Sequence, residues 1–150
     1  MGRSHGIRDE EVGMADGGLI GRFYEEVLSD GKLGLIDELT TEDVIDHEEG
    51  LPGQPSGREG VKFFVNAMRQ GFPDLRPTTI DPTMSDGDLE AARTILSGTH
   101  SGDFMGIPAT GSTVEFESID IIRVSDGKVA EHWGVTDVLT LMQQIGAVPS

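Results

Sequence analysis

The sequence predicts an α+β domain in which helices pack on one face of a curved antiparallel sheet. Apolar residues recur at helical spacing up to Gly71, and from Leu75 onward they alternate as they do in strands. Short turns join the predicted strands, as in antiparallel sheets. A chain of 150 residues fits one such domain with a small pocket. We expect that domain to cover residues 17–150, preceded by a flexible, polar and Gly-rich leader over residues 1–16.

The helical half divides into three predicted helices. The first covers about residues 17–29, where apolar side chains fall on one face. A short second helix follows at about 33–39. The third begins at Ser56 and Glu59, which have capping-box spacing, and carries an apolar face behind them.

The strand-forming half supplies most of the predicted sheet. Asp137 is predicted to cap a final helix after the last strand. A curved sheet covered by helices encloses a cavity at its wide end, where a small ligand can bind. The predicted strands cover residues 44–45, 75–84, 89–100, 113–124 and 128–135.

Composition narrows the function classes. The net charge is −16, with 11 Lys and Arg against 27 Asp and Glu, so a basic face for nucleic acid or for an anionic membrane is not expected. The chain has no Cys, which excludes disulfides and thiolate chemistry. Its apolar runs are too short to span a membrane, and no signal-peptide pattern is present. We therefore expect a cytoplasmic protein.

The segment 118–137 predicts a hairpin whose register decides which polar groups meet. A three-residue loop, 125–127, places Asp120 directly opposite His132 on the face toward the cavity. A two-residue loop instead places Asp120 opposite Trp133. The carboxylate and the imidazole form an acid/base pair only in the first register.

Two stretches carry a family resemblance. GTHSGDFMGIPATGSTVEF (98–116) and IIRVSDGKVAEHWGVTDVLTLMQQIG (121–146) resemble the SnoaL-like polyketide cyclases, a branch of the NTF2-like superfamily, and the likeness covers about residues 19–146. It implies an NTF2-like cone with a deep apolar pocket, a small apolar partner, usually a homodimer, and no metal or organic cofactor. It also implies cofactor-independent acid/base catalysis on a small carbonyl compound, by aldol cyclisation of an ester or by isomerisation.

The chain departs from the family at one position. The cyclases carry an Asp, acting as general acid/base, two residues after the matching His, and here that position is Gly134. Limonene epoxide hydrolases, similar in fold, also have an Asp there and an Arg-x-Asp on an earlier strand, where this chain reads Arg93-Thr94-Ile95. Glycine at 134 enlarges the pocket, or Asp120 and His132 take over the role of the missing carboxylate.

The candidate site residues follow from the register and the resemblance. His132 is the candidate base or acid and Asp120 its orienting partner; the alternative is a hydrogen-bonded pair that only joins two strands. Trp133 is expected on the opposite face of the sheet, in packing or at a dimer interface. The candidate substrate contacts are His47, Arg93, Tyr24, Ser118 and Gly134.

Two other functions stay open. A non-catalytic protein that binds a small ligand fits the same pocket, and a remote epoxide hydrolase is a third possibility. No metal site is expected, since no two histidines have close ligand spacing and HExxH is absent. No Gly-rich phosphate loop is present either.

Overall fold

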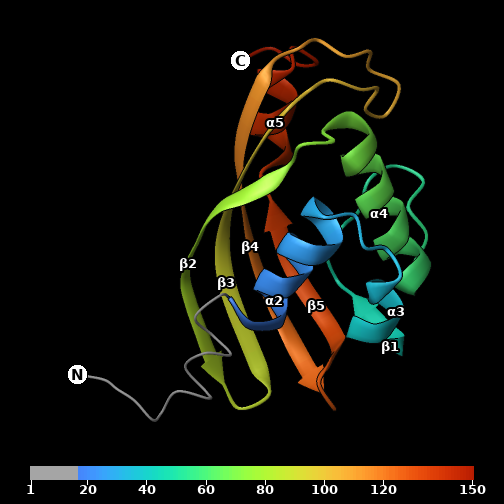
Figure 1. Ribbon diagram of the computed structural model, residues 1–150, viewed down its shortest axis with the longest axis vertical. Coiled ribbons are helices and arrows are strands. Elements are labelled where there is room, and N and C mark those ends of the chain that lie inside the picture. Colours follow the sequence, from blue (N-terminus) through green and yellow to red (C-terminus); the bar gives the residue numbers. More distant parts are fainter. Residues whose placement is uncertain (1–16) are drawn as a thin grey trace.

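The computed structural model describes residues 17–150 and has the predicted α+β architecture. Five strands form one curved sheet in the order β1-β5-β4-β3-β2, and helices α2, α3 and α4 lie on one of its faces (Figure 1). The leader predicted over residues 1–16 lies outside the described residues. The elements are α2 (Gly18–Arg22), η1 (Phe23–Ser29), α3 (Leu35–Leu39), β1 (Thr40–Asp46), α4 (Gly57–Gly71), β2 (Arg76–Asp86), β3 (Leu89–Thr99), β4 (Thr113–Ser125), β5 (Lys128–Thr136) and α5 (Val138–Gln144).

The sheet is mostly antiparallel. Strands β2 to β5 pair in chain order, and β1 joins the free edge of β5 in parallel. This last pairing places Asp46, at the end of β1, beside His132 of β5. A strand from the helical half of the chain therefore completes the sheet next to the predicted acid/base pair.

The helices cover the inner face of the sheet and close the core. Helix α2 continues directly into the π-helical segment η1, so the predicted first helix is confirmed as one unbroken segment. Helix α4 turns Val65 and Met68 inward against Leu96 and Phe116 of the sheet. Within residues 17–150 no helix is long and apolar enough to cross a membrane.

The capping box predicted at Ser56 and Glu59 is wrong. Helix α4 begins after Ser56, but the Ser56 side chain makes no capping hydrogen bond. The next residue, Gly57, has a φ of +69°, so the chain enters the helix in a geometry that a capping box does not use. The predicted cap of α5 is confirmed, because the Asp137 side chain accepts hydrogen bonds from the Thr140 amide and hydroxyl at 3.0 and 2.7 Å.

The β4–β5 hairpin corrects the predicted register. Its loop has two residues, Asp126 and Gly127, with φ angles of 52° and 76°, as in a type I′ turn. The pairing then shifts between Val124↔Val129 and Arg123↔Glu131, because Ala130 is an extra residue on β5. This β-bulge restores the inward direction of the following side chains.

The bulge changes which residues are opposite each other but preserves the shared face. Asp120 pairs with Gly134, and Ile122 pairs with His132, so the predicted direct opposition of Asp120 and His132 is wrong. The two side chains instead meet diagonally on the inner face, two residues apart along the ladder.

Candidate active site

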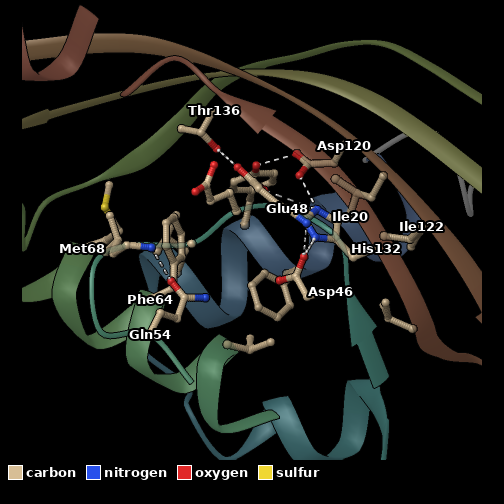
Figure 2. Close-up of a pocket in the computed structure, with 18 of the residues that line it drawn as sticks. Ile20, Asp46, Glu48, Gln54, Phe64, Met68, Asp120, Ile122, His132 and Thr136 are labelled. Atoms are coloured by element: carbon tan, nitrogen blue, oxygen red, sulfur yellow. Dashed lines mark hydrogen bonds and ion pairs between the residues drawn. The ribbon is translucent and has the colours of Figure 1, made fainter. Parts of the chain in front are cut away.

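A cavity of about 360 Å³ lies between the inner face of the sheet, the first helical segment and α4. Its wall is mostly apolar, with Ile20, Phe64, Met68 and Ile122 among the lining residues (Figure 2). Polar side chains gather on one side of it, at the ends of β1 and β5. An apolar cavity with a few convergent polar groups is typical of a small-molecule site.

His132 is the centre of the polar group. Its Nε2 lies 2.7 Å from Asp120 Oδ1, and its Nδ1 lies 2.8 Å from Asp46 Oδ1. Both ring nitrogens therefore face carboxylates, one on β4 and one on β1 (Figure 2). An imidazole that donates from both nitrogens is the protonated imidazolium.

Electrostatics supports that protonation state. Burial alone lowers the pKa of His132, but the hydrogen bonds and negative charges of Asp120 and Asp46 outweigh it and raise the pKa to about 10. Burial raises the pKa of Asp46, yet the hydrogen bond and charge of His132 leave it below its usual range. The His132 ring is thus a cation at neutral pH, flanked by two carboxylates.

Asp120 is held by further hydrogen bonds. Its Oδ2 accepts the Tyr24 hydroxyl at 2.6 Å and the Ser118 hydroxyl at 3.3 Å, while Oδ1 faces His132. Burial, together with the Asp120 carboxylate, raises the pKa of Tyr24 well above its ordinary value. Tyr24 lines the cavity as predicted, but its hydroxyl donates to Asp120. Ser118, predicted as a substrate contact, is 1% exposed and is not among the residues that line the cavity; its hydroxyl donates to Asp120 instead.

Glu48 was missed by the sequence analysis. It follows β1, lines the cavity, and accepts the Thr136 hydroxyl on Oε2 at 3.0 Å, while Oε1 lies 3.9 Å from His132 Nε2. Burial, with the charges of Asp120 and Asp46, raises the pKa of Glu48, although Thr136 and the His132 cation act in the opposite direction. The sequence pattern could have revealed Glu48, because it lies two residues after Asp46 and therefore on the same, inner side when the strand alternation continues past β1.

Gly134 makes room for this arrangement. A Cβ atom at position 134 would lie 2.7 Å from Glu48 Oε1 and 2.8 Å from both Asp120 Oδ1 and His132 Nε2. Such separations are too short for real contacts, so a side chain here would displace at least one of the three groups. Gly134 is not among the residues that line the cavity, so the space it leaves is taken by the acid/base cluster and does not enlarge the pocket.

His47 and Arg93 lie outside the cavity, so their predicted place as substrate contacts there is wrong. His47 points to the outer face of the sheet, where it stacks on Trp133 with ring centroids 5.1 Å apart and bonds Glu131 at 2.7 Å. Arg93 lies on the same outer face and bonds Glu117 at 2.6 Å. The alternation of strand side chains separates both from Asp46 and Asp120. Trp133 faces outward, as the alternation predicted.

One group of described residues has the donors for a cation. Ligand atoms of Glu48, Asp120 and His132 lie within 4.8 Å of one another. Spacing rules did not reveal this group because its members come from three separate segments. Since His132 Nε2 already faces Asp120 at 2.7 Å, a metal ion would have to replace that hydrogen bond.

The fold places the chain among the NTF2-like domains. The profile of the family described as SnoaL-like polyketide cyclase matches residues 18–145, so the chain belongs to that family. The resemblance found in the sequence is thereby confirmed.

Similar proteins support the same family. Aklanonic acid methyl ester cyclases from Streptomyces peucetius and Streptomyces sp. (strain C5) are each 38% identical over 90 residues, or 60% of this chain. The matched region spans only 62% and 56% of those two proteins. A Bacillus cereus protein assigned as a polyketide cyclase is 35% identical, with a TM-score of 0.74 over 87% of this chain and 79% of its own. IdmH from Streptomyces antibioticus is 35% identical, with a TM-score of 0.72 over 85% and 96%.

Proposed function

We propose that this protein is a cofactor-independent enzyme that closes a ring in, or isomerises, a small apolar carbonyl compound such as a polyketide ester. One observation carries the proposal: a cationic imidazole held by two carboxylates lies in the wall of an apolar cavity large enough for such a molecule. The named activity of the aklanonic acid methyl ester cyclases supports it.

The chemistry requires a proton to leave the carbon next to a carbonyl. The enolate that forms carries negative charge, and a nearby cation in a cavity of low polarity stabilises it. His132 supplies that cation, and Asp120 and Asp46 fix its ring orientation. His132 thus acts as electrostatic support for the negative charge that develops on the substrate. A group permanently protonated at neutral pH is a poor base.

The binding alternative rests on a specific observation. Both nitrogens of His132 and both oxygens of Asp120 are already engaged with protein groups, which is also how a purely structural network is built. An epoxide hydrolase has no comparable support, because Arg93 lies on the outer face, away from the cavity.

Conversion of aklanonic acid methyl ester, followed by chromatography, separates the two functions. We expect the wild-type protein to convert the ester, and His132→Asn and Asp46→Asn to lower kcat by at least about 100-fold. Asp46→Asn keeps the His132–Asp120 pair and guards against a variant that fails to fold. Binding of the ester without any conversion by wild-type protein would contradict the enzyme and establish the binding protein.

We also propose a cytoplasmic homodimer formed through the outer face of the sheet. Ile119, Ile121 and Val135 are 52%, 40% and 74% exposed there, next to Trp133. Exposed apolar patches of this kind are typical of interfaces. Light scattering should give twice the 16.1 kDa chain mass, and Ile119→Lys should return it to the monomer. A monomeric wild-type protein would contradict the proposal.

A further inference from the structure

Two charged groups in the described cavity wall have all of their hydrogen-bonding atoms in use. His132 donates to two carboxylates, and Asp120 accepts on both oxygens. In Glu48, Thr136 occupies only Oε2, and within residues 17–150 its Oε1 accepts no hydrogen bond, as is also the case for Asp46 Oδ2 and the Glu49 carboxylate. Of these oxygens, Glu48 Oε1 lies 3.9 Å from His132 Nε2. Figure 2 shows the Glu48 carboxylate beside His132 and Asp120 on the cavity side.

Glu48 can occupy this place only because residue 134 has no side chain. The ideal Cβ position of residue 134 is 2.7 Å from Glu48 Oε1, so the Glu48 carboxylate fills the space that a side chain at 134 would need. The two positions thus compete for one volume next to His132 Nε2.

Resting on the function proposed above, we propose that Glu48 is the catalytic base of the reaction. Its Oε1 takes a proton from the carbon next to the substrate carbonyl, and the C–H electron pair becomes the enolate. The enolate carbon then bonds to a second carbonyl carbon of the same molecule, whose π electrons move to its oxygen. That alkoxide takes the proton back from Glu48. Protons and electrons balance within the substrate, and no co-reactant is needed.

The surroundings of Glu48 suit this task. Burial raises the pKa of its carboxyl, and a carboxylate of higher pKa is the stronger base. The His132 cation, 3.9 Å from Oε1, favours the carboxylate form and lies where it can stabilise the enolate formed beside it. Thr136 fixes the carboxylate orientation through Oε2.

The first test makes the same change, Glu to Gln, at two positions: Glu48, which follows β1, and Glu42, which lies within it. Glu48→Gln removes the base and keeps the side-chain shape, whereas Glu42→Gln changes an exposed residue of β1. With aklanonic acid methyl ester as the probe, Glu48→Gln should lower kcat by about 10²–10⁴-fold and leave the melting temperature near that of Glu42→Gln. Equal kcat in the two variants would overturn the assignment of Glu48, while conversion by both would leave the proposed function standing.

The second test exploits the shared volume. Glu48→Ala should be inactive, and adding Gly134→Asp to it should restore at least about a tenth of the wild-type kcat, because a carboxylate returns to the same space. Gly134→Asp alone should lower kcat, since two carboxylates then compete for one place. No rescue by the double variant, when it is folded by circular dichroism, would show that a carboxylate at this place does not act as the base. If the wild-type protein fails to convert the ester, the function itself fails and the Glu48 assignment with it.

Discussion

His132 connects three strands through one ring. It lies on β5 and bonds Asp46 on β1 and Asp120 on β4, at 2.8 and 2.7 Å. Removing one partner of such a partly buried ion pair is costly, because an uncompensated charge remains. The same contacts that organise the candidate active site therefore also join the edge strand β1 to the sheet.

Tyr24 is expected to be a positioning residue for Asp120. Tyr24→Phe removes the 2.6 Å hydrogen bond to Asp120 Oδ2 and leaves a buried oxygen with only the 3.3 Å contact from Ser118. We expect the free energy of unfolding to fall by about 1–3 kcal/mol, measured by urea denaturation. Kinetically, kcat should fall more than KM rises, because Asp120 orients His132 rather than the substrate. Ser118→Ala is the matched control, and an equal or larger loss there would contradict the role of Tyr24.

Several residues of the site were predicted from the sequence, but which of them contact one another was predicted only in part. Asp120, His132 and Tyr24 were predicted from the hairpin, the helix and the family resemblance, and all three line the cavity. Asp46 and Glu48 were not predicted as site residues, because their approach depends on the parallel pairing of β1 with β5, a contact between segments 86 residues apart. Local patterns do not encode such long-range pairing.

At the scale of elements, the bulge at Ala130 is decisive. A hairpin with the turn Asp126–Gly127 and no bulge would put His132 on the outer face, away from Asp120. One extra residue reverses that outcome. Hydrophobic alternation correctly predicted both strands of the hairpin, but it carries no marker for a single-residue bulge. His47 directly follows β1 and points away from the cavity, opposite to Asp46, because the alternation of side chains along the strand continues into it.

The last helix offers a test of element stability separate from the site. Asp137 caps α5 through the Thr140 amide, so Asp137→Ala should lower the free energy of unfolding by about 1 kcal/mol. Conversion of the ester should be unchanged below the melting temperature, because Asp137 does not line the cavity. Urea denaturation with parallel kinetics measures both. A loss of activity in the folded variant would show that α5 also shapes the site.

At the scale of the whole molecule, the cluster makes stability depend on pH. The folded pKa of His132, about 10, is above its ordinary 6.5, so its stabilising contribution is complete below about pH 6.5 and is lost as the pH rises toward 10. The pKa of Asp46 is lowered from 3.8, so its contribution is present above that pH and is lost on acidification. Stability should therefore be greatest in the weakly acidic range.

Urea denaturation across pH measures this dependence. Between about pH 6.5 and 10 the free energy of unfolding should fall by roughly 2–4 kcal/mol, at about 1.4 kcal/mol per unit of pKa difference. His132→Asn is the control, because it lacks the titrating ring and should show a flatter alkaline limb. A wild-type profile as flat as that of the variant would contradict the ion-pair network.

The roles proposed for the site residues depend most on the charge state of His132. Nitrogen-15 NMR of the labelled wild-type protein at about pH 8 reports directly whether each ring nitrogen carries a proton. We predict that both Nδ1 and Nε2 are protonated there, and that the ring loses a proton only near pH 10. A ring that is neutral at about pH 8 and titrates near its ordinary pKa of 6.5 would contradict the cationic His132. It would also contradict the proposal that His132 stabilises negative charge while Glu48 acts as the base.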